Sequence, residues 1–288
     1  MKKVLVLGGT RFFGIHLVEA LLNNGVDVTI ATRGMSNDPF ADKVKRISFD
    51  RSDVTSFQKA FTGTQWDVVF DQICYTSEDA QDAIDVFTGK TGKYVFTSSN
   101  SVYKAGLEGA VEEEYYPYTY PITMGGRNDF SYPEGKRQAE AVFFQKAPFP
   151  VTAVRFPIVL GKNDYTNRLA YHVEKIHNEE DLYFTNLEAE ISFILETEAG
   201  EFLAWAGDQE FNGPVNACSN GSIKLGDIIS LIEKETEKTA VVSDASKNVS
   251  PFDLEKTWTM NNEKARSYGY KFTNLMEWLP DLIGHFAK

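Results

Sequence analysis

The sequence has little cysteine and no long apolar run. Its 288 residues include two cysteines, Cys74 and Cys218, which are too few for a disulfide framework and form no metal-ligand spacing, so we expect a reducing, cytoplasmic location. No stretch approaches the roughly 20 apolar residues of a membrane-spanning helix. The apolar run at residues 4–7 is too short for the core of a signal peptide. The sequence therefore predicts no membrane partner.

Histidine and positive charge are also scarce. The four histidines, His16, His172, His177 and His285, share no metal-binding pattern, so no metal is expected. Lysine and arginine number 29 against 41 aspartates and glutamates, which gives a net charge of −12. Binding to a nucleic-acid backbone depends on clustered positive charge, so the composition disfavours a nucleic-acid partner. An overall content of 42% hydrophobic and 24% charged residues is typical of a globular protein.

Short apolar runs alternate with segments of helical spacing over the first 155 residues. We expect strands at residues 4–7, 28–31, 44–49, 68–70, 94–97 and 151–155. We expect helices at residues 12–23, 54–61, 77–88 and 132–146, with Asp53 as an N-cap. This order predicts an α/β fold, a Rossmann-type doubly wound parallel sheet with helices on both faces. Ligands of such sheets bind at the carboxyl ends of the strands.

The alternation becomes less regular after residue 156. Helices are expected at residues 165–177, 197–206, 223–236 and 273–287, and strands at 191–194 and 214–217. We therefore predict a dinucleotide-binding domain at residues 1–160, with about 205–240 packing back onto it. Residues 161–288 would form mainly a smaller substrate lobe and the C-terminal helices. The aromatic-rich stretch 113–121 is either a packed surface loop or a cover over the substrate.

A glycine-rich turn follows the first predicted strand. Gly8 permits a tight turn, and Gly14 permits close packing of the next helix on the sheet. The start of that helix offers N–H groups and partial positive charge to a phosphate. The middle glycine of the common dinucleotide fingerprint is replaced here by Arg11. The whole turn is a predicted cofactor site, made of Gly8, Gly9, Thr10, Arg11, Phe12, Phe13 and Gly14.

The end of the second strand bears on the choice of cofactor. It has no acid to bind ribose hydroxyls, and it carries Arg33 instead. Arg33 and Arg11 would suit a 2′-phosphate, so NADP is favoured over NAD, although Arg33 could be only a solvated loop residue. Asp50 and Arg51 follow the third strand and are both candidate cofactor-binding residues. Asp50 would either accept the adenine amino group or form a simple turn before the helix.

Candidate catalytic residues follow the fifth strand. Tyr132 and Lys136 are four apart and share one face of a helix, with Pro133 in its first turn. An ammonium close to a phenol favours the phenolate, so such a pair can exchange a proton with an alcohol or a carbonyl. Lys136 could also hold the nicotinamide ribose. Residues 97–101 form a hydroxyl cluster that would polarise a substrate oxygen, or simply a polar turn.

These motifs together resemble the short-chain dehydrogenase/reductase superfamily, of the epimerase/dehydratase type, over nearly the whole chain. The resemblance implies that Ser99 polarises the substrate, Tyr132 exchanges its proton and Lys136 binds ribose, while Glu140 matches an acid often found on the same helix. It implies an NAD(P)-dependent oxidoreductase or epimerase acting on a carbonyl or alcohol carbon, with a sugar or nucleotide sugar as the candidate substrate. Reduction and epimerisation are not distinguished. Asn100 stands where sugar 4,6-dehydratases have an acid, which disfavours that activity.

At two places the sequence departs from the usual pattern of this family, and both departures resemble an atypical branch of it. The turn reads Gly-Gly-x-x-x-x-Gly, and the fourth strand ends in Asp71-Gln72-Ile73-Cys74-Tyr75 instead of a His-x-Ala-Ala-like sequence. That branch includes chloroplast RNA-binding and isoflavone-reductase-like proteins. The alternative function is therefore a non-catalytic dinucleotide-binding sensor or an RNA-associated protein. Family members often dimerise through helices equivalent to 77–88 and 132–146, but the first is acidic here, so a homodimer and a monomer both remain open.

Overall fold

A computed structural model describes residues 2–244 and 247–288 of the chain. The chain divides into two compact units. Unit 1 runs to Tyr103 and also contains Glu112–Phe156 and Thr197–Ala217. Unit 2 contains Lys104–Val111, Pro157–Glu196 and Cys218–Lys288. Within the described residues, no helix has the length and apolar character needed to cross a bilayer.

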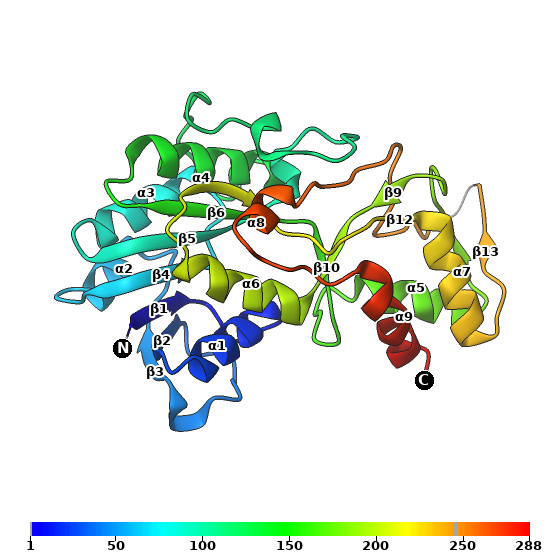
Figure 1. Ribbon diagram of the computed structural model, residues 1–288, viewed down its shortest axis with the longest axis horizontal. Coiled ribbons are helices and arrows are strands. Elements are labelled where there is room, and N and C mark those ends of the chain that lie inside the picture. The colour runs from blue at the N-terminus through cyan, green and yellow to red at the C-terminus, as the bar shows by residue number, and fades with distance from the viewer. Residues whose placement is uncertain (1, 245–246) are drawn as a thin grey trace. The chain divides into compact units, whose positions relative to one another are not determined.

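Unit 1 is built on a seven-stranded sheet in the order β11-β6-β5-β4-β1-β2-β3 (Figure 1). The strands are β1 (Lys3–Leu7), β2 (Asp27–Thr32), β3 (Lys45–Ser48), β4 (Trp66–Asp71), β5 (Thr91–Ser99), β6 (Val151–Phe156) and β11 (Gly213–Asn216). All neighbouring strands are parallel. The order reverses between β1 and β4, where doubly wound folds bind their ligands. The predicted Rossmann-type sheet is confirmed.

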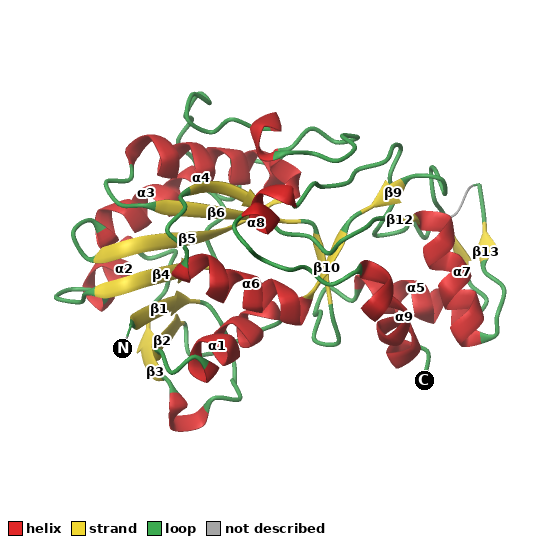
Figure 2. Cartoon of the chain, viewed as in Figure 1, coloured by secondary structure: helices red, strands yellow, loops and turns green. Residues whose placement is uncertain are grey.

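Helices cover both faces of this sheet (Figure 2). One face carries α2 (Val54–Ala60), α3 (Ser77–Phe87) and α4 (Tyr132–Lys146), and the other carries α1 (Phe13–Asn23) and α6 (Glu196–Asp208). A side chain at Gly200 of α6 would overlap the backbone of α1 at Leu17, and one at Gly207 would overlap the ring of Phe70. These glycines therefore let α6 lie close to α1 and to the sheet.

Local sequence signals set the starts of these helices. The side chains of Asp53, Thr76 and Ser131 accept backbone hydrogen bonds at the N-termini of α2, α3 and α4. Such caps satisfy N–H groups that have no partner inside a helix. Helix α1 differs, because its N-cap residue Phe12 provides no side-chain hydrogen bond. Short 3₁₀ helices occur at η1 (Ala41–Lys43), η2 (Asn100–Val102) and η3 (Glu112–Glu114).

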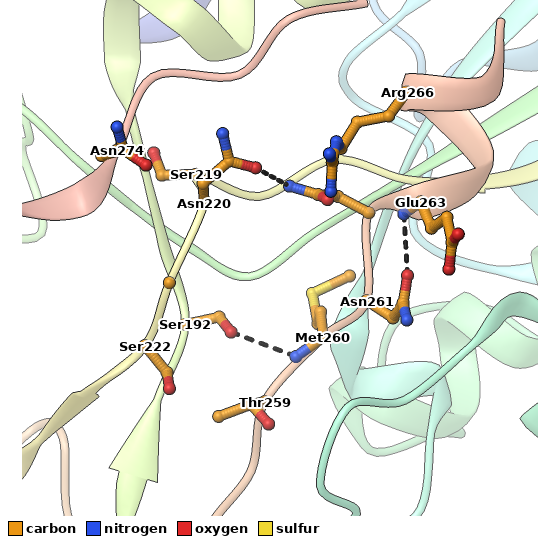
Figure 3. Close-up of a pocket in the computed structure, with 12 residues that line it drawn as sticks. Ser192, Ser219, Asn220, Ser222, Thr259, Met260, Asn261, Glu263, Arg266 and Asn274 are labelled. Atoms are coloured by element: carbon orange, nitrogen blue, oxygen red, sulfur yellow. Dashed lines mark hydrogen bonds between the residues drawn. The ribbon is translucent and has the colours of Figure 1, made fainter.

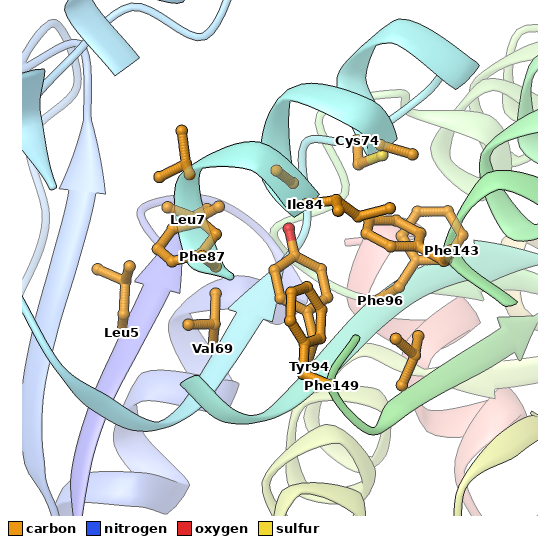
Figure 4. Close-up of a cluster of buried hydrophobic side chains, with 14 of the residues drawn as sticks. Leu5, Leu7, Val69, Cys74, Ile84, Phe87, Tyr94, Phe96, Phe143 and Phe149 are labelled. Carbon is orange, nitrogen blue, oxygen red and sulfur yellow. The ribbon is translucent and has the colours of Figure 1, made fainter. Parts of the chain in front are cut away.

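Aromatic side chains fill the core between the sheet and helices α2, α3 and α4 (Figure 4). The ring of Tyr94 lies 5.9 Å from Phe87, 5.0 Å from Phe143 and 5.6 Å from Phe149, measured between centroids. Its hydroxyl donates a 2.5 Å hydrogen bond to Asp71 Oδ2. The core thus encloses a hydrogen bond between Tyr94 and Asp71, and buried polar groups are tolerated where they are paired in this way.

Unit 2 contains helices packed on short strand pairs. The helices are α5 (Arg168–His177), α7 (Leu225–Thr236), α8 (Glu263–Ser267) and α9 (Leu275–Phe286). The strands are β7 (Ile158–Leu160), β8 (Asp181–Leu182), β9 (Glu190–Ile191), β10 (Phe193–Leu195), β12 (Ile223–Lys224) and β13 (Val241–Val242). They pair as β10–β7, β12–β9 and β13–β8. The strand expected at 191–194 is interrupted at Ser192, whose Oγ accepts a hydrogen bond from the backbone of Met260.

A histidine is buried in the core of unit 2. The imidazole of His172 contacts the Arg168 carbonyl through Nδ1 and Ser250 Oγ through Nε2, both at 2.7 Å. It stacks on Phe252 with centroids 4.4 Å apart. Burial lowers the pKa of His172 to about 4, because the charged form would lose its hydration.

This pKa predicts an acid-sensitive contribution to stability. Between about pH 6.5 and 4 the unfolded chain binds a proton at His172 that the folded chain excludes, so stability falls as the pH falls through that range. The lowered pKa corresponds to a loss of about 3 kcal/mol. Urea unfolding at several pH values should show a shallower acid loss for His172→Gln than for the wild type. The exposed His177 on the same helix is the control, and equal slopes for wild type and His172→Gln would contradict the assignment.

Candidate functional site

The glycine turn joins β1 to α1 at the point where the strand order reverses. Gly8 and Gly9 have φ of 100° and 85°, a conformation that favours glycine. Helix α1 starts without a side-chain cap and without an acidic residue in its first turn. The positive end of its dipole is therefore free of a competing carboxylate, and the turn is suited to an anion such as a pyrophosphate.

The third glycine of the turn accommodates a side chain from the end of β4. A Cβ built on Gly14 would collide with Oε1 of Gln72 and would lie 3.0 Å from the Cα of Gly9. A Cβ built on Gly8 would lie 3.6 Å from the Cβ of Gln72. The Gln72 side chain therefore lies against both Gly8 and Gly14. No sequence motif indicates Gln72, although the end of the fourth strand is atypical.

The remaining turn residues differ in exposure. Arg11 is exposed, Thr10 and Phe13 are half-buried, and Phe12 is buried. The Phe13 ring packs 5.3 Å from Phe12 and 5.7 Å from Phe156, measured between centroids. The two phenylalanines thus anchor the start of α1, while Arg11 extends into solvent from the same turn.

The ends of β2 and β3 bring together two predicted cofactor residues. Arg33 is exposed just beyond β2, and Asp50 follows β3. Asp50 Oδ1 accepts hydrogen bonds from the backbone and the hydroxyl of Ser52, at 2.9 and 2.7 Å. Those bonds, together with the charge of Arg33, lower the pKa of Asp50. Arg33 and Asp50 therefore act on each other electrostatically at this edge of the sheet.

Arg51 points in another direction from its neighbour Asp50. Its buried guanidinium lies 2.7 Å from Asp71 Oδ2 and 3.3 Å from Asp79 Oδ1. Burial alone would lower its pKa, but the nearby carboxylates raise it well above the ordinary value. The same carboxylates accept backbone hydrogen bonds from Ile73 and Tyr75. Arg51 thus helps to hold the segment that links β4 to α3.

The segment between β4 and α3 also accepts a hydrogen bond from Lys136, the predicted ribose-binding lysine. Lys136 on α4 is 1% exposed, and its Nζ donates to the carbonyls of Cys74 at 2.7 Å and Thr97 at 2.8 Å. The ammonium also lies 4.5 Å from the ring centroid of Tyr75 and 4.8 Å from that of Phe96, which is within the range of cation–π attraction. The carbonyls occupy two of its three N–H groups.

Tyr132 is the first residue of α4 and is 53% exposed. Its ring centroid lies 5.9 Å from Lys136 Nζ. Ser99 ends β5 and is 9% exposed, and its Oγ accepts a 3.2 Å hydrogen bond from the backbone of Ser101. Lys136 is thus bound to the carbonyl of Thr97, two residues before Ser99 on β5. On α4 it lies one helical turn after the accessible phenol of Tyr132.

A buried ion pair joins α4 to the sheet one turn beyond Lys136. Arg155 and Glu140 are both fully buried, with Arg155 Nη2 2.6 Å and Nε 3.0 Å from the two carboxylate oxygens. Ser98 Oγ donates a 2.5 Å hydrogen bond to the same carboxylate. Although burial opposes it, Glu140 raises the pKa of Arg155, so the guanidinium stays charged. Ser98 precedes Ser99, so the pair also fixes the end of β5.

This network continues to β11. Arg155 Nη1 donates to Tyr103 Oη at 3.0 Å, and Tyr103 Oη donates to Asn216 Oδ1 at 2.5 Å. Glu112 Oε1 accepts the backbone N–H of Asn216 at 2.7 Å. Burial raises the pKa of Tyr103, which keeps its hydroxyl as a neutral donor. These partners are far apart in sequence, so no local motif indicated them.

The aromatic-rich loop at 113–121 packs on α4. Tyr115 donates to the carbonyl of Arg137 at 2.6 Å, and Tyr120 contacts the carboxylate of Glu134 at 3.0 Å. Tyr116 remains 57% exposed. These contacts agree with the prediction of a packed surface loop.

Unit 2 contains a polar pocket of about 520 Å³ (Figure 3). Most of its lining side chains carry an amide or a hydroxyl: Ser192, Ser219, Asn220, Ser222, Thr259, Asn261, Asn262 and Asn274. Asn262 Nδ2 donates to Asn220 Oδ1 at 3.1 Å, so part of this polarity is satisfied internally. Arg266 adds a cation and Glu263 an anion to the wall. No group of three or more potential metal ligands occurs within residues 2–244 and 247–288.

Residues 4–218 match the model of the NAD dependent epimerase/dehydratase family. The chain belongs to this family. The predicted resemblance to the epimerase/dehydratase type is therefore confirmed. The glycine turn, β5 and α4 all fall within the matched region.

Solved structures of similar fold extend over almost the entire chain. UDP-glucose 4-epimerase of Thermus thermophilus, solved as a complex with NAD, is 20% identical with a TM-score of 0.75, covering 99% of this chain and 98% of that one. UDP-glucuronic acid 4-epimerase of Bacillus cereus, solved with UDP-glucuronic acid and NAD, is 19% identical with a TM-score of 0.76 over the same shares. At these identities the likeness concerns the fold.

A more local similarity links the chain to a plant protein. The chloroplast stem-loop binding protein of 41 kDa b of Arabidopsis thaliana is 31% identical over 115 residues. The match covers 35% of this chain and 30% of the plant protein, so the chain spans about a third of that relative's length.

Proposed function

We propose that the protein oxidises, reduces or epimerises an alcohol or carbonyl carbon of a nucleotide sugar, with a nicotinamide dinucleotide as cofactor. The observation that carries this proposal is the pairing of accessible Tyr132 with buried Lys136, one turn apart on α4. The nucleotide-sugar substrate class is supported by structures of similar fold that were solved as 4-epimerases of UDP-sugars.

The residues of unit 1 fit a dinucleotide. The uncapped start of α1 and the conformations of Gly8 and Gly9 suit its pyrophosphate. The remaining N–H of Lys136 would hold the ribose next to the nicotinamide, since the other two bind carbonyls. When bound, the nicotinamide exchanges a hydride with the substrate carbon.

The side chains would move the proton that accompanies that hydride. In the oxidative direction, Ser99 Oγ hydrogen-bonds the substrate hydroxyl. The proton of that substrate hydroxyl passes to Tyr132 Oη as the substrate carbon loses hydride and becomes a carbonyl. The charge of Lys136 stabilises the phenolate that accepts this proton. In the reductive direction Tyr132 returns the proton to the oxygen. Epimerisation would use both steps, with the carbonyl turned between them.

The edge of β2 supports acceptance of a 2′-phosphate. Arg33 is exposed beyond this strand, whose own end carries no acid for the ribose hydroxyls, and Arg11 is exposed on the glycine turn. Guanidinium groups bind phosphate through paired hydrogen bonds. We therefore propose that the site takes NADP in preference to NAD, with Arg33 as the selecting residue.

Substitution of the phenol tests the catalytic assignment. Tyr132→Phe should lower kcat about a hundredfold or more and leave the dissociation constant of the cofactor nearly unchanged, because only the proton-exchanging hydroxyl is lost. Steady-state kinetics with UDP-sugars and cofactor titration measure the two effects. Tyr116→Phe, at another exposed tyrosine, is the matched control. Unchanged turnover in Tyr132→Phe would refute the assignment.

Cofactor choice is tested by removal of a charge. Arg33→Ala should weaken NADPH binding about tenfold or more and affect NADH little, because a charge-assisted bond to the 2′-phosphate is lost. Fluorescence titration of both reduced cofactors gives the ratio, and Lys43→Ala, an exposed cation in η1, is the control. Tighter binding of NADH than NADPH by the wild type would show that Arg33 does not select NADP.

RNA association is the second candidate function, favoured by the local similarity to a stem-loop binding protein. The net charge of −12 opposes it, because phosphate backbones are bound by clustered cations. We expect no gel shift with a structured RNA at physiological salt. A shifted RNA band at physiological salt would support this second candidate function.

A further inference from the structure

One residue at the glycine turn was not indicated by any motif. Gln72 directly follows β4, and its backbone N–H donates to the carbonyl of Leu7 at 3.2 Å. This bond places Gln72 at the end of β1, beside the turn. Its side chain lies against Gly8 and Gly14, and any side chain at Gly14 would collide with its amide. Gly14 thus makes room for a polar group in the turn itself.

The amide of Gln72 is incompletely satisfied. Its Nε2 atom is buried and has no hydrogen-bond partner among the described residues. Buried donors in folded proteins are normally paired, so such an atom calls for an acceptor that the chain does not provide. The same side chain lies against Gly14, where α1 begins without a side-chain cap or an acidic residue in its first turn. An anionic oxygen would satisfy the amide donor and the helix start together.

We propose that Gln72 is a cofactor-binding residue, whose side-chain amide donates a hydrogen bond to an oxygen of the dinucleotide pyrophosphate. The inference rests on the proposed use of a nicotinamide dinucleotide. A neutral amide suits this place because burying it against the turn costs less than burying a charge, and the cation of the turn itself, Arg11, stays exposed. Gln72 would thus bind the part of the cofactor that NAD and NADP share.

If Gln72 binds the cofactor, its replacement should not lower the stability of the free protein but should weaken cofactor binding. Gln72→Leu removes an unsatisfied donor, so the melting temperature of the free protein should stay the same or rise. The same change removes a hydrogen bond to a charged group, so binding should weaken about tenfold or more. Gln72→Glu should weaken binding further, because a carboxylate would face the pyrophosphate. A residue that only supported the turn would lose stability instead.

Calorimetric titration of the full chain with NAD, NADP and ADP-ribose tests the proposal. All three carry the pyrophosphate, so Gln72→Leu should weaken them by the same factor, with an unchanged or higher melting temperature. Gln58→Leu, at an exposed glutamine of α2, is the matched control and should bind as the wild type does. If Gln72→Leu does not fold, Gln72→Met removes the same donor with an unbranched side chain.

The outcomes separate this inference from the proposed function. If the wild type binds a dinucleotide and Gln72→Leu binds it equally well, the Gln72 inference is wrong and the proposed function stands. Loss restricted to NAD and NADP, with ADP-ribose unaffected, would place the contact at the nicotinamide end and overturn the pyrophosphate assignment. If the wild type binds none of the three, both proposals fail.

Discussion

The candidate site depends on one buried ammonium. A lysine removed from water is tolerated only where other groups replace its hydration, and Lys136 meets this requirement through the carbonyls of Cys74 and Thr97. Those carbonyls belong to the segment after β4 and to β5. The need to solvate a single charge therefore brings α4 against the ends of two neighbouring strands. Tyr132 occupies the accessible end of the same helix.

Other buried charges stabilise the groups around Lys136. The pair of Glu140 and Arg155 fixes α4 against β5 and β6 and holds Ser98, the residue before Ser99. Arg51 holds the carboxylates that position the segment carrying Cys74. Removing one partner of a buried pair leaves an uncompensated charge, which typically costs about 3–5 kcal/mol. Buried ion pairs thus fix the positions of the groups around Lys136, whereas the phenol of Tyr132, the predicted proton-exchanging group, stays open to solvent.

Much of this arrangement could be predicted from the sequence because it depends on local patterns. Apolar runs separated by helical spacing identified the parallel sheet, and the cap at Asp53 was found where it was expected. The spacing of Tyr132 and Lys136 placed them on one helix face. Their proposed chemical roles remain predictions, as does the preference for NADP.

Other features depend on partners that are distant in the sequence. Arg51 follows Asp50, yet its guanidinium turns inward because Asp71 and Asp79 provide carboxylates there. The two-residue strands of unit 2 are too short to show a periodicity. The position of Gln72 against Gly14 depends on the close approach of β4 and β1, which no local sequence pattern indicates.

The most direct test of the account is whether the protein transfers hydride between a nucleotide sugar and its cofactor. Rapid mixing of the oxidised cofactor complex with UDP-glucose or UDP-glucuronic acid, followed by the absorbance of reduced nicotinamide, measures this step. Reduced cofactor should form in the wild type, and Lys136→Met, which removes the buried charge, should abolish its formation. Equal signals from the wild type and Lys136→Met, or no reduced cofactor in a wild type that binds both ligands, would contradict it.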